Sequence, residues 1–188
     1  PPGHHAEAMQ AMGFCLFNNV AIGALHARVA HGLSRVAVID FDVHHGNGTQ
    51  HMFERDPHLF YASSHQWPLY PGTGSERETG VGNIVNAPLR PNSGGKEFRA
   101  AFETKILPAL DKFAPELVII SAGFDAHEDD PLASLMLHEQ DYEWVTAALA
   151  EVARTHAKGR VVSALEGGYD LGALAASSAA HVRALLAA

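Results

Sequence analysis

The sequence VAVIDFDVHH, residues 36–45, joins a short apolar run to a group of acidic and histidine residues. The same order recurs in LVIISAGFD at 117–125 and in VVSALEGGYD at 161–170. Short runs rich in Val and Ile between polar residues or Gly are typical of buried parallel strands. In an open α/β sheet, ligands bind in the crevice outside the carboxyl ends of the strands. The three stretches therefore predict an α/β fold in which separate strands deliver polar side chains to one rim.

Strand-like and helix-like patterns alternate along the chain, which favours βα units around a parallel sheet flanked by helices. We expect strands at 36–41, 59–63, 84–89, 116–121 and 160–165, and helices at 19–30, 48–54, 95–113, 139–156 and 171–186. The first helix is expected to have Asn18 or Asn19 as its N-cap. The Gly- and Pro-rich stretch 65–82 is expected to form a loop too polar for the core, and a loop of this length is more often functional than idle.

Composition and charge exclude several classes of protein. A chain of 188 residues suits one domain or part of one, and 47% hydrophobic with 18% charged residues is ordinary for a globular protein. The net charge of -8 and the absence of a Lys/Arg cluster argue against direct contact with nucleic acid. No apolar run approaches the roughly 20 residues that a membrane span needs, so we expect no membrane partner. Cys15 is the only cysteine, which predicts a reducing compartment, here the cytoplasm.

Asp42 and His44 are the first candidates for metal ligands. They stand two residues apart just past a predicted strand, so they share one side of the backbone while it remains extended. Asp125, at the end of another strand, would complete a set of one nitrogen and two oxygen donors. This set suits Zn²⁺ first and Fe²⁺ or Co²⁺ next, with an open position for catalysis. Taken alone, Asp42 and His44 fit a polar turn that caps the next helix as well as they fit a metal site. When Asp125 and the histidine pair are considered with them, the metal site is favoured.

A site with two carboxylate ligands acidifies a bound water less than an all-histidine site, so it needs a general base nearby. His4 and His5 are the candidates, because imidazole titrates near working pH. Taken alone, adjacent histidines on a Pro-Gly turn fit an exposed polar loop better. Tyr169 follows Gly167 and Gly168, which let the backbone approach a ligand, and its phenol could donate to an oxyanion. The alternative is a Tyr that packs at a strand end.

Several blocks of the chain together resemble the histone deacetylase family, with its acetoin-utilisation and acetylpolyamine amidohydrolase relatives. The blocks are PPGHHA at 1–6, GFC at 13–15 with Asn18 and Asn19, DFDVHHGNGT at 40–49, YPGTG at 70–74, SAGFD at 121–125 and EGGYD at 166–170. They occur in the order of the family and extend over essentially the whole chain. The resemblance implies an arginase/deacetylase α/β fold and zinc-dependent hydrolysis of the amide of N-acetyl-lysine, in a protein or peptide, or of a small acetylated amine.

The resemblance also implies a role for each matching residue. Zinc would be bound by Asp42, His44 and Asp125, and catalysis would use His5 as general base, His4 as its electrostatic partner and Tyr169 to polarise the acetyl carbonyl. The channel around the acyl-lysine chain would involve Phe14, Leu132, Gly167 and Gly168. A structural potassium ion would be bound by Asp40, Ser63 and the backbone oxygens of Asp42, His44 and Ser64.

Three positions refine the resemblance. Asp40 would hold His4, and Asn47 stands where class I members carry an acid beside the second histidine, which makes the chain class II-like. A neutral amide raises the pKa of His5 less than a carboxylate would, which keeps this imidazole available as a base. Leu132 stands where polyamine-selective members place a gatekeeping Glu, which favours a neutral acyl-lysine over a cationic polyamine.

Members of the family carry a substantial portion of chain before the histidine pair. The resemblance therefore implies that residues 1–188 form the C-terminal portion of a single deacetylase domain whose N-terminal portion is absent. A sheet without its early strands exposes an edge and an apolar face. A homo-oligomer or a partner segment would cover them.

Two other functions remain open at this point. An arginase-type hydrolase with two manganese ions would need further bridging carboxylates near Asp125, but Asp129 and Asp130 lie beyond a turn and are expected at the rim. An inactive acyl-lysine-binding fragment would keep the fold without turnover. The presence of a base and an oxyanion donor together argues against this second alternative.

Overall fold

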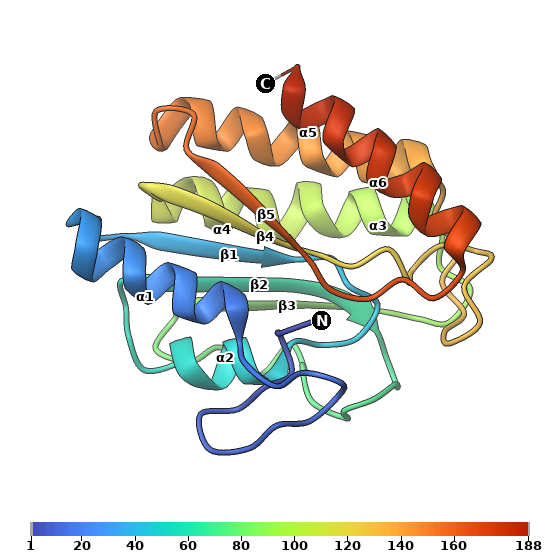
Figure 1. Ribbon diagram of the computed structural model, residues 1–188, viewed down its shortest axis with the longest axis horizontal. Helices are drawn as coiled ribbons and strands as arrows, with labels where there is room; N and C mark the ends of the chain where they lie inside the picture. Colours follow the sequence, from blue (N-terminus) through green and yellow to red (C-terminus); the bar gives the residue numbers. More distant parts are fainter. Residues whose placement is uncertain (1, 188) are drawn as a thin grey trace.

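A five-stranded parallel sheet forms the centre of the molecule, in the computed structural model that describes residues 2–187 (Figure 1). Its strands are β1 (Val36–Asp40), β2 (Leu59–Gln66), β3 (Ile84–Leu89), β4 (Leu117–Ala122) and β5 (Val161–Leu165). Their spatial order is β3-β2-β1-β4-β5, so the direction of winding reverses between β1 and β4. This confirms the predicted α/β fold. Ligand crevices in such sheets lie at the point of reversal, here at the ends of β1 and β4.

Helices cover both faces of the sheet (Figure 1). One face carries α1 (Asn19–His31) and α2 (Asn47–Phe53); the other carries α3 (Gly95–Ala101), the π-helical segment η1 (Phe102–Ile106), α4 (Leu107–Phe113), α5 (Glu139–His156) and α6 (Leu171–Leu186). Because side chains alternate along a strand, β1 contributes to two apolar cores. Ala37 and Ile39 pack with the α3–α5 side, whereas Val36 and Val38 pack with α1 and α2. Among the described residues, no helix is both long and apolar enough to cross a bilayer.

The predicted helix 95–113 is present, but its middle is wider than an α-helix. The π-helical segment Phe102–Ile106 separates two α-helical parts. Pro108 is the second residue after this segment, and its backbone nitrogen carries no hydrogen to donate to the turn before it. A local π-turn accommodates the missing bond and the bulk of the ring. Apolar spacing predicted the extent of this helix but not its interruption.

The prediction that the stretch 65–82 is too polar for the core is wrong at its start. His65 and Gln66 continue β2 and are buried. Their polar atoms are satisfied, since His65 Nε2 lies 2.9 Å from the Gly74 carbonyl oxygen and Gln66 Oε1 accepts from the Ser134 N–H. Buried polar side chains are tolerated when they find such partners.

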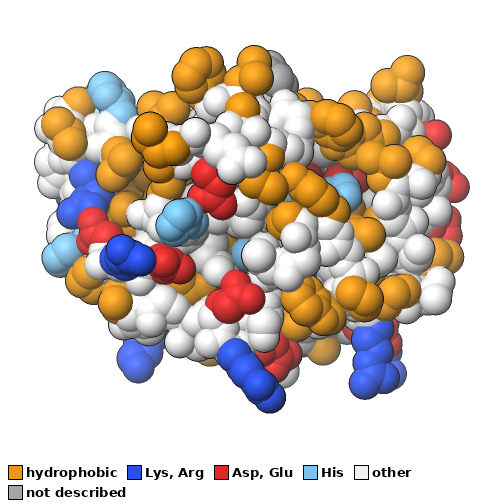
Figure 2. Space-filling model, turned by 90° about the horizontal axis from the view of Figure 1, so that it is seen from below, with side chains coloured by type: hydrophobic (Ala, Val, Ile, Leu, Met, Phe, Trp, Pro, Cys, Tyr) orange, Lys and Arg blue, Asp and Glu red, His pale blue; other side chains and the backbone are white. Residues whose placement is uncertain are grey.

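The prediction that β5 is a buried strand is also wrong. β5 pairs only with β4 and forms one edge of the sheet, with Val162 and Leu165 each 54% exposed. Ile22 and Val29 of α1 are exposed as well. Figure 2, which views the molecule from below, shows further apolar side chains gathered in patches on the side that carries α2. A five-residue apolar run fits an edge strand as well as a central one, so burial could not be inferred from it.

The N-cap of α1 ties three segments together. Asn18, not Asn19, is the cap: its Oδ1 accepts from the Ala21 N–H at 3.0 Å. Its buried Nδ2 lies 3.1 Å from Thr49 Oγ1 of α2 and 3.4 Å from the Ala6 carbonyl oxygen. Asn18 therefore holds α1 and α2 against the segment that carries the histidine pair.

Replacement of Asn18 by Ala should lower the free energy of unfolding by about 1–2 kcal/mol, because it removes the cap and leaves buried polar groups unpaired. Asn18→Asp keeps the cap acceptor and should cost less. Chemical denaturation of the three proteins measures the difference. Equal stability of wild type and Asn18→Ala would contradict the role of this side chain.

Candidate metal centre and substrate channel

The three predicted metal ligands lie together at the point where the winding of the sheet reverses. Donor atoms of Asp42, His44 and Asp125 all lie within 4.8 Å of one another. His44 Nδ1 is 3.1 Å from Asp42 Oδ1 and 3.0 Å from Asp125 Oδ2. Both carboxylates are buried. One imidazole nitrogen and two carboxylate oxygens at this spacing are a donor set that fits a divalent transition metal.

Backbone amides and glycines fix the two carboxylates. Asp42 Oδ2 accepts from the Gly167 N–H at 2.8 Å, and Asp125 Oδ1 accepts from the Val43 N–H at 2.9 Å. A Cβ atom on Gly123 would lie 2.2 Å from Asp42 Oδ2, and one on Gly167 would lie 2.3 Å from Asp125 Oδ2. Only glycine fits at these two positions, since such contacts are far inside van der Waals distance.

The electrostatics of the ligand set favour a cation. Burial and the nearby charge of Asp42 raise the pKa of Asp125 to about 7. Burial opposes the charged form of His44, but the carboxylates of Asp125 and Asp42 outweigh it and raise the pKa of His44 to about 10. These two buried acids stabilise positive charge between them. A bound metal ion would take the place of the His44 proton.

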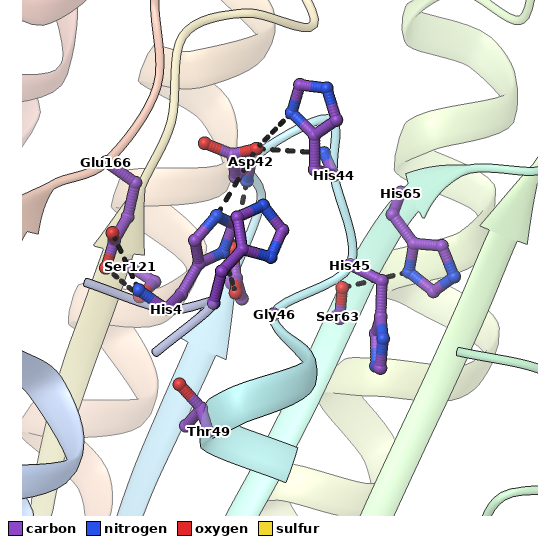
Figure 3. A network of polar contacts seen from close by, with 12 residues as sticks. His4, Asp42, His44, His45, Gly46, Thr49, Ser63, His65, Ser121 and Glu166 are labelled. Carbon is purple, nitrogen blue, oxygen red and sulfur yellow. Dashed lines mark hydrogen bonds and ion pairs between the residues drawn. The ribbon is translucent and has the colours of Figure 1, made fainter. Parts of the chain in front are cut away.

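The histidine pair adjoins these ligands: His4 Nε2 lies 3.8 Å from Asp42 Oδ1 (Figure 3), and the ring centroids of His5 and His44 are 6.0 Å apart. His4 Nδ1 lies 2.9 Å from Asp40 Oδ2, and His5 Nδ1 lies 2.8 Å from Asn47 Oδ1. The two rings are 4.1 Å apart between centroids, and both residues are buried. The structure thus places Asp40 and Asn47 beside the histidines that the sequence assigned to them, and the pair is not an exposed loop. Glu166 adds to this placement, since its Oε2 accepts from the His4 N–H at 3.1 Å.

The two adjacent imidazoles have opposite protonation states. Burial disfavours the charged form of His4, but Asp40 and Asp42 outweigh it and raise the His4 pKa well above its usual value. Burial, together with the charge of His4, lowers the pKa of His5 to about 3. His4 is therefore a fixed cation, and His5 is a neutral imidazole able to accept a proton.

Glu7 decides which nitrogen of His5 is free, a role that the sequence did not reveal. Asn47 Nδ2 donates to Glu7 Oε1 at 2.6 Å, so Asn47 Oδ1 faces His5. An acceptor oxygen requires that His5 Nδ1 carry the hydrogen. The lone pair is then on Nε2.

Tyr61 of β2 is another contributor that the sequence did not reveal. Its buried hydroxyl donates to Asp40 Oδ2 at 2.9 Å and accepts from the Gly46 N–H at 3.0 Å. Burial raises the pKa of Asp40 to about 6, although His4 lowers it. The sequence predicted that Tyr61 lies in a strand, 59–63, but gave no sign of its hydroxyl's partner.

A cavity of about 390 Å³ opens over the ligands. Its lining residues are His5, Gly13, Phe14, His44, Tyr70, Leu132 and Tyr169. The predicted channel residues Phe14 and Leu132 are among them, but Gly167 and Gly168 are not. Gly167 lies against the carboxylates of Asp125 and Asp42 instead. Tyr70 was not assigned to the site, although its ring lies 5.1 Å from that of His5. Its place in a long loop was the available signal.

Tyr169 and Phe14 face each other across the cavity, with ring centroids 6.4 Å apart. Burial, and then the charges of Asp125 and Asp42, raise the pKa of Tyr169 above its usual value, so its phenol remains a donor. Phe14 has a φ of 62°, a conformation that costs an aromatic residue about 1–3 kcal/mol and is most common at functional sites.

Asp130 departs from the expectation that it is a rim residue. It is only 6% exposed, and its Oδ2 accepts from the Tyr169 N–H at 2.7 Å. Asp129, by contrast, has a side chain that is 67% exposed. Neither residue joins a group of metal-binding donors; among residues 2–187, Asp42, His44 and Asp125 form the single such group.

Replacement of Asp125 by Ala should reduce bound metal from near one ion per chain to less than about a tenth of that, because two donors do not hold a divalent ion against competing water. Elemental analysis after dialysis measures the metal content. Asp129→Ala, which removes an exposed carboxylate nearby, should keep the metal. Equal metal content in both variants would exclude this ligand set.

The chain resembles known proteins over nearly its whole length. Residues 1–185 match the family model of the histone deacetylase domain. Histone deacetylase 10 of Oryza sativa, a chloroplast protein, is 47% identical over 99% of this chain and 43% of its own length. A histone deacetylase-like amidohydrolase of Pseudomonas aeruginosa is 43% identical over 90% of this chain and 46% of its own.

A solved structure, the HD domain of HDA15, superposes with a TM-score of 0.94 and 42% identity over all of this chain and 53% of that one. The chain thus spans about half the length of these three relatives. The sheet and its helices are those of a histone deacetylase domain. The chain belongs to the histone deacetylase family.

Proposed function

We propose that this protein is a zinc-dependent deacetylase that hydrolyses the amide of N-acetyl-lysine, or of a similar acylated amine. One observation carries the proposal. One cavity is lined by His44 of the three-donor cation site, by the neutral imidazole of His5, whose neighbour His4 is charged, and by the protonated phenol of Tyr169. Relatives named as deacetylases and amidohydrolases support this reaction class.

The donors Asp42, His44 and Asp125 would hold the ion, which supplies Lewis-acid polarisation of the carbonyl and the attacking water. His5 Nε2 accepts the proton of that water as the water attacks the amide carbon. His4, charged through Asp40, lowers the energy of the negative charge that develops beside it.

The remaining steps concern the oxyanion and the leaving group. Tyr169 donates its phenolic hydrogen to the carbonyl oxygen as this oxygen gains negative charge. The imidazolium of His5 then returns its proton to the amine nitrogen, and the C–N bond breaks to give acetate and the free amine.

The walls of the cavity favour an acyl-lysine substrate. Phe14, Tyr70 and Leu132 surround the opening with apolar surface, which suits the aliphatic stem of a lysine. Leu132 adds no charge at the rim, so the substrate proposed is a neutral acyl-lysine in preference to a cationic polyamine. An acetylated peptide and an acetylated polyamine, compared by kcat/KM, distinguish these two substrate classes.

A potassium ion beside the catalytic site is proposed from the family resemblance. Its ligands would be Asp40 and Ser63, with backbone oxygens of Asp42, His44 and Ser64. One arrangement supports it: His65 Nε2 donates to the Gly74 carbonyl, so His65 Nδ1 accepts from the Ser63 hydroxyl (Figure 3). The lone pairs of Ser63 Oγ then remain available for a cation.

The binuclear arginase-type reaction is disfavoured by the surroundings of Asp125. Asp130 already accepts backbone N–H groups, and Asp129 is exposed. One metal ion per chain, not two, is the expected stoichiometry. An inactive acyl-lysine binder is disfavoured because it needs neither a base nor an oxyanion donor.

Replacement of Tyr169 by Phe should lower kcat on an acetyl-lysine peptide by about 10²–10³-fold, the effect of losing one oxyanion donor. The assay uses the full-length protein loaded with zinc. Tyr142→Phe is the matched control, because the Tyr142 hydroxyl is buried and has no hydrogen-bond partner, so its loss should leave turnover unchanged. Near-normal turnover of Tyr169→Phe would remove this phenol from the mechanism.

Replacement of Asn47 by Asp should shift the pH profile. Burial keeps the pKa of His5 at about 3. A carboxylate at position 47 would stabilise the charged imidazole and raise this pKa by about one to three units. A base with a higher pKa is protonated, and thus inactive, up to a higher pH. The acid limb of kcat/KM should therefore move to higher pH, and an unmoved limb would contradict the role of His5 as base.

A further inference from the structure

Asp130 is a buried carboxylate that neither binds the predicted metal nor enters the proposed reaction. It lies in the segment between β4 and α5 and is 6% exposed. Its Oδ2 accepts from the N–H groups of Tyr169 at 2.7 Å and Asp170 at 3.3 Å. Its Oδ1 accepts from the Leu132 N–H at 3.0 Å. One side chain therefore holds the backbone of two residues, Tyr169 and Leu132, that line the same cavity.

The Tyr169 segment needs such an anchor because its own backbone restrains it little. Gly167 and Gly168 precede Tyr169, and glycine populates more backbone conformations than any other residue. Gly168 has a φ of 144°, in the region that L side chains rarely adopt. Beyond Tyr169, Asp170 caps α6 by accepting from the Ala173 N–H at 2.8 Å. Tyr169 thus lies between a pair of glycines and the first turn of a helix.

We propose that Asp130 is a positioning residue that fixes where the Tyr169 phenol and the Leu132 rim lie over the metal centre. The inference rests on the proposed function, since it assigns the placement of the oxyanion donor in that reaction. Hydrogen bonds to an ionised acceptor are shorter and stronger than neutral ones, so a carboxylate holds three amides better than an amide oxygen would. A displacement of about 1 Å at a catalytic group can cost about 10²-fold in rate.

A double-mutant cycle separates positioning from general stability. The four full-length, zinc-loaded proteins are wild type, Asp130→Asn, Tyr169→Phe and the combination of the two. Asp130→Asn keeps the shape of the side chain but turns an NH₂ group toward backbone donors. We expect it to lower kcat about tenfold or more when Tyr169 is present, and less than about twofold in the Tyr169→Phe background. Equal losses in both backgrounds, or none in either, would overturn the proposal.

Asp141→Asn is the matched control. Asp141 is also buried and accepts a backbone N–H, that of His138 at 3.1 Å, but it does not line the cavity. Its replacement should lower the melting temperature and leave kcat unchanged. A loss of kcat from Asp141→Asn as large as that from Asp130→Asn would attribute both effects to stability, against the proposal. Should Asp130→Asn not fold, Asp130→Glu, which moves the carboxylate by one methylene, replaces it in the same cycle.

Amide hydrogen exchange provides a readout that does not depend on turnover. In Asp130→Asn, the amides of residues 169 and 170 should exchange about tenfold faster or more, because an anchored amide must open before it exchanges. Unchanged exchange would overturn the anchoring role. A wild type without activity on acetyl-lysine would overturn the proposed function alone, and exchange would still test the contact.

Discussion

Three carboxylates, Asp40, Asp42 and Asp125, lie fully buried at the ends of two neighbouring strands. An unpaired buried carboxylate is so costly that the fold must surround each with hydrogen-bond donors or positive charge. The donors come from the whole chain: the His4 imidazole from the N-terminal segment, Tyr61 from β2, and the Gly167 amide from the segment after β5. The order of the strands, the close approach of the glycines and the placement of the histidines all help to surround the buried carboxylates with such partners. A bound cation would complete it.

The sequence predicted most of the framework. Helices 139–156 and 171–186 were expected at the bounds that the structure gives them, because their apolar spacing is regular and an acidic residue or a preceding Asp marks the start. The ligands were predictable because Asp42 and Asp125 lie within three residues of the ends of apolar strands. Burial of β5 was predicted wrongly, and the roles of Glu7, Tyr61 and Asp130 were missed. These depend on partners about 20 to 40 positions away or on the edge of the sheet, which no local pattern encodes.

Adjacent histidines illustrate how far environment, and not residue type, decides chemistry. His4 and His5 are neighbours in the chain and in space, yet one faces a carboxylate and the other a neutral amide. The first imidazole is held as a cation, and its charge helps to keep the second neutral. Pairs of titratable groups whose surroundings separate their pKa values are the mark of an acid and a base with distinct tasks.

Gly123 and Gly167 limit which substitutions can be made beside the candidate metal centre. At either position a single methyl group would occupy the volume of a carboxylate oxygen of Asp42 or Asp125. The backbone there cannot retreat freely, since Gly167 donates to Asp42 and β4 is hydrogen-bonded on both sides. The smallest side chain that an L-amino acid can add would therefore spread the donor atoms apart, although it changes neither charge nor any ligand. The affinity of this centre for a cation would therefore depend on the lack of a side chain at Gly123 and Gly167 as much as on the three ligands.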